Sequence, residues 1–475
     1  MEKGARSAVM AGSHEGVGMK QGIKQGKGRW LPGGMPLIVG MGDLTVGASP
    51  VSAHGGLAHV QVTAWAVENL PQGELRQFLA PPETFNSILL GAAYPDVGYY
   101  PGLEDHDLHR AYGEYSHWTP FLSEFVKWIK TNDPPPWTSL ESRKRVAFLL
   151  GCAAHGFQDE VFDSLFLPMV EHHDGEGQDA VDPATDGLLV RDGYMGMYPT
   201  LEAPLEALAE VFNDSGLFRA PITPEMLSTS LENMGLFYLD EGAGPALASI
   251  ALASFENVLL WTADHYMDPV IPGSLHSEVF PTGWMIQAMW EELKGVPSEK
   301  MVVFQYPEEG RRLGSGQAGN PASWVSLLFS TGVDLDDIEV RWSHSSGVDV
   351  PFSRNKTDWA RVLMLVPSAD LIPGDIYSIS LKGNVTTVSG GLQTLERSIS
   401  IQVECDKPDD ARCSVADEVP VARLDGADSF RKEWGQVESS DEKGCGGCSG
   451  VGQGGVWSLL LLVLLVTRRR QGAWF

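Results

Sequence analysis

The spacing of apolar residues changes once along this chain, and that change constrains the fold more than any other feature. From about residue 54 to 300, apolar side chains recur every three or four positions, as in Val146–Leu150, Glu202–Phe212 and Ala246–Tyr266, which is the period of a helix buried on one face. From about 301 to 404 the period is two, with Gly, Pro, Asp and Asn between the runs, as in sandwich strands. The sequence therefore predicts a multidomain chain, with an all-α domain at 54–300 followed by a β-sandwich at 301–404.

The predicted sandwich contains Phe329-Ser330, and Tyr377-Ser378-Ile379 before Gly390-Gly391. Through these residues it resembles the Ig-like modules of bacterial surface-layer and adhesin proteins. It implies a spacer, or alternatively a module that binds a glycan or a lipid surface. The expected strands are Trp324–Ser330, Ile338–Trp342, Ile376–Leu381 and Ser398–Val403.

The first 53 residues have the layout of a signal peptide. Basic residues between Lys20 and Arg29 precede a moderately apolar stretch, which ends in the small residues Val51-Ser52-Ala53. A cleavage pattern of this kind predicts a mature chain that begins at His54. The protein is therefore expected to be exported.

The last residues are expected to form a sorting or anchor tail at 444–475, after an acidic linker at 405–443. Cys445 and Cys448 precede the apolar run Trp457–Val466 and the cluster Arg468–Arg470. The run is about half of the ~20 residues that cross a bilayer, which favours a processing signal over a plain tail anchor. The layout resembles the Cys-containing sorting tails of myxobacterial surface proteins, which implies a sorting protease as partner and attachment to the cell surface or outer membrane, or secretion.

The charge of the chain excludes some classes of partner. Lys and Arg total 34 against 62 Asp and Glu, a formal net charge of −28. Such acidity argues against nucleic acid and anionic membranes as partners. Among the cysteines, Cys152 lies in an apolar helical pattern and is expected to be a buried thiol, while Cys405 and Cys413 can form a disulfide in an oxidising compartment.

Candidate metal ligands lie in the helical half. His155 and Asp159 are four residues apart and share one helix face, with Asp163 one turn further along. Asp182 and Asp186 repeat the same spacing. Zinc accepts nitrogen and carboxylate ligands together, although a His–Asp pair of this spacing, taken alone, is more often a buried hydrogen-bonded pair than a metal site.

Two further candidates lie upstream. Asp96 directly follows a turn, and His117 comes just before a helix that has Pro120 in its first turn. Taken together, several such elements on the buried side of one helical domain favour a metal site over separate hydrogen-bonded pairs.

These residues belong to motifs that make the chain recognisable. The motifs are Gly55–His59, Gly91–Asp96, Ser116–Phe121, Pro136-Trp137, and Val146–Gly151 leading to His155 and Asp159. Through them, residues 54–190 resemble the zinc-dependent phospholipase C/D family, in particular the catalytic domain of glycosylphosphatidylinositol-specific phospholipase D.

The resemblance implies up to three zinc ions in a cleft of the helical domain. It places His59, Asp96, His117, His155 and Asp159 on family ligands, with Asp159 bridging two metals. It also implies that the mature N-terminal residue, His54, binds metal through its α-amino group and carbonyl.

The chain departs from the family at the second metal. Asp163, Asp182 and Asp186 stand where the family has two histidines and an acid. Carboxylates favour harder cations, so this position suits calcium, magnesium or manganese, or binds zinc weakly. His172 and His173 are alternative nitrogen donors.

The expected function is an exported, surface-attached, metal-dependent phosphodiesterase that hydrolyses phospholipids or related phosphate esters. Asp96 would orient or deprotonate the attacking water. The alternative is a degenerate phospholipase-like domain, which acts as a metal-stabilised surface binding or adhesion protein.

Overall fold

The computed structural model describes residues 55–100, 106–194, 197–236, 243–255, 257–296, 302–308, 311–335, 337–356, 361–387 and 392–405. The expected signal peptide, His54, all of the expected linker except Cys405, and the C-terminal tail lie outside these residues. Cys405 is disulfide-bonded, and its expected partner Cys413 also lies outside. Across the described part of the chain, no helix combines the length and the apolar character needed to span a bilayer.

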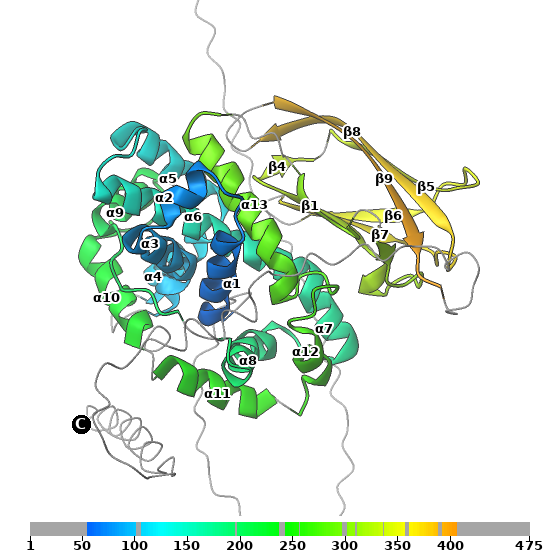
Figure 1. Ribbon diagram of the computed structural model, residues 1–475, viewed down its shortest axis with the longest axis horizontal. Coiled ribbons are helices and arrows are strands. Elements are labelled where there is room, and N and C mark those ends of the chain that lie inside the picture. The colour runs from blue at the N-terminus through cyan, green and yellow to red at the C-terminus, as the bar shows by residue number, and fades with distance from the viewer. Residues whose placement is uncertain are drawn as a thin grey trace, which may run out of the picture. The chain divides into compact units, whose positions relative to one another are not determined.

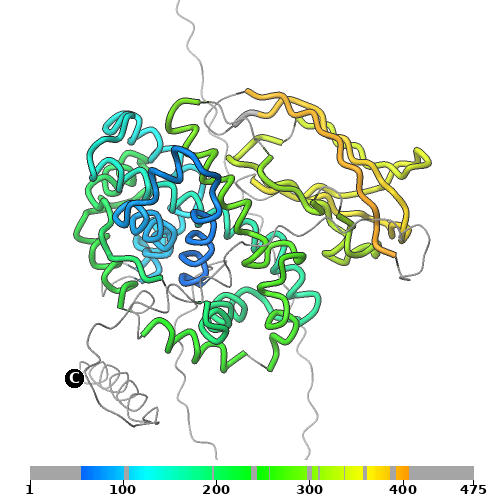
Figure 2. Tube along the Cα trace, viewed as in Figure 1, coloured from blue at the N-terminus to red at the C-terminus, as the bar shows by residue number. Residues whose placement is uncertain are grey.

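The first half of the described chain is helical, as the apolar period predicts (Figure 1). The central helices are α1 (Gly56–Glu68), α3 (Pro82–Ala93) and α6 (Leu140–Val161), which later helices surround in Figure 2. The other helical elements are α2 (Glu74–Leu79), η1 (Tyr94–Tyr99), α4 (His106–Ser116), α5 (Thr119–Asn132), η2 (Phe162–Phe166), α7 (Leu167–His173), α8 (Gln178–Arg191), α9 (Leu205–Asp214), α10 (Pro224–Met234), α11 (Ala243–Phe255), α12 (Leu260–His265) and α13 (Leu275–Leu293).

Helix α6 forms the centre of the helical region because its last two-thirds is buried on every side. All of its residues from Val146 to Val161 are buried, as expected for a helix inside a large core. Helix α3 packs closely against it at two glycines, Gly91 and Gly151. A Cβ at either glycine would overlap the backbone of the other helix, so both positions need a residue without a side chain.

One predicted helix is divided. The apolar segment Ala246–Tyr266 was expected to be continuous, but α11 ends at Phe255 and α12 begins at Leu260. The carboxylate of Asp174 accepts the backbone N–H groups of Trp261 and Thr262, each at 2.9 Å. This contact gives α12 its own capped N-terminus, which the apolar period cannot reveal.

The second half is a β-rich region with two sheets, so the predicted order of helices and then strands is confirmed. One sheet has the order β1-β3-β7-β6, and the other has β2-β9-β8-β4 with β5 also paired to β8. All described pairings are antiparallel except β2 with β9. The strands are β1 (Val302–Tyr306), β2 (Arg312–Leu313), β3 (Val325–Phe329), β4 (Val333–Asp334), β5 (Glu339–His344), β6 (Phe352–Lys356), β7 (Val362–Pro367), β8 (Ile376–Thr387) and β9 (Leu392–Val403).

The β-rich region packs against the helices. Val303, Leu328 and Val362 belong to the same buried cluster as the helical core, and β1 contacts α13. A second apolar cluster, which includes Trp342, fills the β-rich region itself. The β-rich region is therefore packed onto the helical core, and its role as a spacer or as a module that binds a glycan or a lipid surface stays a prediction.

Candidate metal centre

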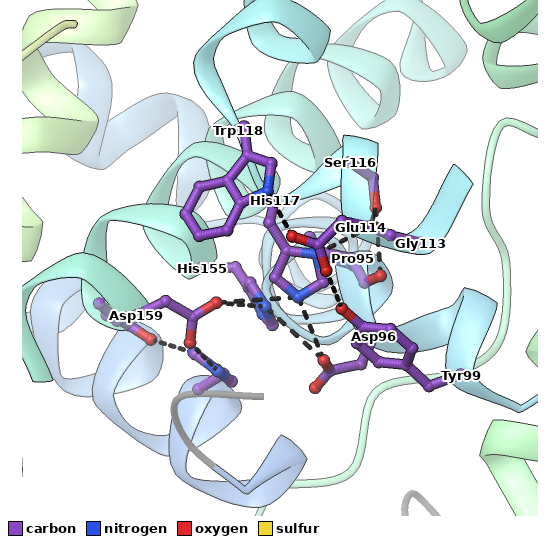
Figure 3. Close-up of polar contacts among 12 residues, drawn as sticks. Pro95, Asp96, Tyr99, Gly113, Glu114, Ser116, His117, Trp118, His155 and Asp159 are labelled. Atoms are coloured by element: carbon purple, nitrogen blue, oxygen red, sulfur yellow. Dashed lines mark hydrogen bonds and ion pairs between the residues drawn. The ribbon is translucent and has the colours of Figure 1, made fainter. Parts of the chain in front are cut away.

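Five predicted ligands come together inside the helical region. They are supplied by α1, η1, the turn between α4 and α5, and α6, and each is almost fully buried. Figure 3 shows four of them, Asp96, His117, His155 and Asp159, with their side chains pointing toward one another. The set is His59, Asp96, His117, His155 and Asp159.

Asp159 lies at the middle of this group. Its Oδ1 is 3.1 Å from Nε2 of His59, and its Oδ2 is 3.1 Å from Nε2 of His155 and 3.8 Å from Nε2 of His117. Asp96 completes the group, with Oδ1 at 3.3 Å from His117 Nε2 and 3.9 Å from His155 Nε2. Asp159 thus faces three imidazoles.

The three imidazoles are held in one tautomer by acceptors behind them. The Nδ1 atoms of His59, His117 and His155 lie 2.8, 2.8 and 2.7 Å from the side-chain oxygen of Gln158 and the carbonyls of Gly113 and Ala92. An oxygen acceptor requires a proton on Nδ1, so Nε2 of each ring faces the cluster and offers a lone pair there when the ring is neutral, as in a metal-bound state.

These residues fit zinc. A zinc ion with ligands at ~2.0–2.1 Å in tetrahedral geometry separates its ligand atoms by about 3.4 Å, close to the separations of 3.1 and 3.3 Å between Asp159 or Asp96 and the rings. His155 Nε2 and Asp159 Oδ1 have no hydrogen-bond partner among the described residues. Two ligand triads satisfy metal-like spacing, His59-His155-Asp159 and Asp96-His117-His155.

The electrostatics of the group favour ionised carboxylates. Burial acts to raise the pKa of Asp159, but the charges of His155 and His59 outweigh it and hold that pKa well below its usual range. Burial lowers the pKa of His155, as does the charge of His59 stacked on it at 3.7 Å. For His117, burial opposes ionisation, yet the bond to Asp96 and the charges of Asp159 and Asp96 raise the pKa to about 9.

Asp163 and Asp182 are placed beside this group. Asp163 lies on η2, a π-helical turn that begins at Phe162, so it does not simply continue the face of His155 and Asp159; it accepts a bond from Gln178 at 3.4 Å. Asp182 on α8 is buried, and its Oδ1 has no partner among the described residues. Burial and neighbouring carboxylates, Asp159 among them, raise the pKa of both well above the usual range.

Asp186 has a structural role at the start of α1. Its two oxygens accept the backbone N–H groups of Leu57 at 3.2 Å and Ala58 at 2.9 Å. Gly55 lies against the same carboxylate, since a Cβ there would overlap it. Burial raises the pKa of Asp186 to about 7, although these N–H bonds oppose the change.

The alternative nitrogen donors are not part of the group. His172 and His173 lie exposed at the end of α7, where the ring of His173 stacks on Trp261 with centroids 4.7 Å apart. The alternative that they supply the second metal is therefore wrong, because α7 carries their rings to the surface.

Sequence reasoning missed two buried residues at the centre. Gln158 orients His59 and also donates to Thr63 Oγ1 at 3.0 Å; its position between His155 and Asp159 is the only local signal. Glu278 on α13 is fully buried, and burial together with the charges of Asp159 and Asp163 raises its pKa well above the usual range. The sequence presents Glu278 as an ordinary first-turn acid of a helix.

Comparisons with known proteins match this part of the chain. Residues 58–162 match the model of the family described as zinc dependent phospholipase C. Phosphatidylinositol-glycan-specific phospholipase D of Homo sapiens is 32% identical over 133 residues, 28% of this chain and 15% of that protein. The Dictyostelium discoideum protein of the same name is 35% identical over 83 residues, 18% of this chain and 8% of its own. The chain thus matches less than a fifth of the length of these relatives.

Similarity to solved structures is weak. CopC from Methylosinus trichosporium OB3b covers 22% of this chain and 95% of its own at 19% identity, with a TM-score of 0.19. Surface layer protein SbsC, domains 1–6, covers 61% of this chain and 45% of its own at 10% identity, with a TM-score of 0.17. Neither TM-score supports an argument about fold or function. The sequence comparisons and the buried cluster fall on the same residues, and the helical region of this chain is similar over residues 58–162 to the zinc dependent phospholipase C family.

Proposed function

We propose that the protein is a metal-dependent phosphodiesterase that hydrolyses phospholipids or related phosphate esters at a multinuclear zinc site. The observation that carries this proposal is that Nε2 of three imidazoles faces Asp159 or Asp96 inside one buried cluster of ionisable side chains. His155 Nε2 and Asp159 Oδ1 each lie 3.1 Å from an ionisable partner without a hydrogen bond of good geometry among the described residues, as expected of atoms that share a metal ion.

The residues divide into metal ligands and one residue that would orient or deprotonate the attacking water. His59, His117, His155 and Asp159 would hold the metal, which when bound supplies Lewis acidity that neutralises phosphate charge and makes water more acidic. Asp96 is held ionised, because the charge of His155 and the bond to His117 outweigh burial and lower its pKa. Its carboxylate can therefore accept a proton from water or orient that water toward phosphorus.

The location of the protein is also part of the proposal. The signal-peptide layout before His54 and the Cys-containing tail at 444–475 support an exported protein attached to the cell surface. A phospholipid substrate and a sorting protease for the tail would then meet the protein outside the cytoplasm.

One observation favours the alternative, a binding or adhesion protein that has lost turnover. Both oxygens of Asp186 are engaged by the N-terminus of α1, and the second metal position has no histidine. A domain with fewer ions would keep the stability of a metal centre and lose much of the phosphate neutralisation that catalysis requires.

The experiment compares Asp96→Asn with Asp159→Asn in the hydrolysis of a chromogenic phosphocholine ester. We expect wild-type activity to disappear with a chelator and return with zinc. Asp159→Asn should lose both metal and activity, while Asp96→Asn should keep at least one ion and lose activity by ~10²-fold or more. Activity that survives chelation, or that is unaffected by both substitutions, contradicts the proposal.

A further inference from the structure

An arginine of the β-rich region contacts residues beside the proposed metal ligands. Arg361 directly precedes β7 and is only 1% exposed. Its Nε donates to Oε1 of Glu160 at 3.0 Å, and its Nη2 donates to the carbonyl oxygen of His117 at 3.4 Å. Glu160 follows Asp159 on α6, so one guanidinium contacts the two segments that carry His117, His155 and Asp159.

Helix α6 has two neighbouring faces, one toward the metal centre and one toward Arg361. His155 and Asp159 form one i,i+4 pair, which faces the metal centre. Gly156 and Glu160 form the next such pair, which faces Arg361. A Cβ at Gly156 would overlap the His117 carbonyl and lie 3.1 Å from Arg361 Nη2, so the absence of a side chain there lets the His117 loop and the guanidinium approach the helix.

The β-sheet fixes the position of this arginine. The backbone N–H of Phe329, at the end of β3, donates to the carbonyl of Arg361 at 2.7 Å. Val362, the next residue, is part of the core shared with the helices. Arg361 is therefore held at its backbone by strand β3, and at its guanidinium by Glu160 on α6 and by the carbonyl of His117.

We propose that Arg361 is a positioning residue of the metal centre, which ties the His117 loop to α6 and so makes the β-rich region a structural component of the site. This inference rests on the proposed metal site. His117 Nε2 and Asp159 Oδ2 come from different segments and lie 3.8 Å apart. Arg361 binds both the backbone carbonyl of His117 and the side chain of Glu160, which is next to Asp159. It can therefore set the distance between His117 Nε2 and Asp159 Oδ2.

A purely structural ion pair makes a different prediction from a positioning contact. Removal of one member leaves a buried unpaired charge and destabilises the fold, whereas replacement of both members by apolar residues is often neutral or stabilising. The double substitution also leaves the net charge unchanged. If the double variant regains the stability of the wild type but not its metal affinity, the loss of affinity comes from the lost positioning contact. It then comes neither from lower stability nor from a change in net charge beside the metal.

The test measures zinc affinity by competition with a fluorescent chelator, the visible spectrum of the cobalt-loaded protein, and the Tm of the metal-free protein, all on the full chain. Arg361→Met should lower the Tm and weaken zinc binding roughly 10- to 100-fold, the range for outer residues of metal sites. Glu160→Met with Arg361→Met should restore the Tm while zinc binding stays weak and the cobalt spectrum stays altered. Arg361→Lys should be intermediate, because one ammonium cannot reproduce the fork that spans both acceptors.

A matched control is Arg354→Met. Arg354 donates to the carbonyls of Ile338 and Leu335 at 2.9 and 2.7 Å, within the β-rich region, and its loss should change the Tm without changing zinc affinity. Zinc affinity that recovers with the Tm in the double variant, or that equals wild type in Arg361→Met, overturns the inference alone. A wild-type protein that binds neither zinc nor cobalt overturns the proposed function as well.

Discussion

His59 on α1 and Asp159 on α6 meet with 3.1 Å between Nε2 and Oδ1. The contact joins the first helix of the described chain to the central helix of the core. Because Asp159 also faces His155 and His117, a metal bound there would connect α1, α6 and the turn before α5. Metal binding and folding of the helical region are therefore expected to be coupled.

His155→Ala should show this coupling. The substitution removes a nitrogen from both candidate triads and leaves the Asp159 carboxylate less compensated. We expect loss of at least one zinc ion and a fall in stability of ~3–5 kcal/mol in the zinc-loaded protein. Elemental analysis and calorimetry check the two effects, and unchanged metal content together with an unchanged Tm would exclude His155 from the site.

Glu278→Gln tests the acidic side of the centre. Burial and the charges of Asp159 and Asp163 raise the pKa of Glu278, so ionisation of its carboxyl destabilises the metal-free fold at neutral pH. In the presence of a chelator, the variant should have a higher Tm than wild type at neutral pH. This difference in Tm should shrink as the pH falls toward the unfolded-state pKa of about 4.5. With metal present, it should bind a second ion more weakly, and equal ion counts would place Glu278 outside the site.

Asp186→Asn tests the buried carboxylate at the start of α1. A folded-state pKa of about 7, raised from 3.8, means that this group contributes stability at low pH that is lost as pH rises from about 4 to 7. In chelator, wild type should therefore lose stability more steeply than the variant across this window. The lost N–H bond adds an offset that does not vary with pH, so a difference in stability that stays constant from about pH 4 to 7 would contradict the raised pKa.

An extension upstream of His54 tests the proposed N-terminal ligand. Gly55, the first residue that the structure describes, packs against Asp186 beside the centre. A peptide nitrogen has no available lone pair, whereas a free α-amino group does. Protein processed after Ala53 should bind more zinc and hydrolyse ester faster than protein with an uncleaved tag, and equal values in the two forms would rule out this ligand.

Much of the fold could be predicted from the sequence, because it depends on local periodicity. The change from a period near four to a period of two marks the change from helices to sheets, and His155 and Asp159 share a face by helix geometry alone. The break between α11 and α12 could not be predicted, since it depends on Asp174, which comes from a distant segment. The π-helical turn at η2, which moves Asp163, likewise has no signal in apolar spacing.

The candidate site divides in the same way. The convergence of His59, Asp96 and His117 with α6 was anticipated through a family resemblance rather than through periodicity. Gln158 could have been found as a polar residue on a buried helix beside two ligands. Glu278 and Arg361 could not, because each reaches the centre only through tertiary packing of α13 or of the β-rich region.

The most direct test of the account is the metal content of the purified protein, measured by elemental analysis alongside Asp159→Asn. Asp179→Asn is the matched control, because Asp179 is an exposed acid in the first turn of α8. We predict two to three zinc ions per chain in wild type and in Asp179→Asn, and at least one ion fewer in Asp159→Asn. A wild-type protein without bound metal, or an Asp159→Asn variant that keeps the full metal content, would contradict the central claim.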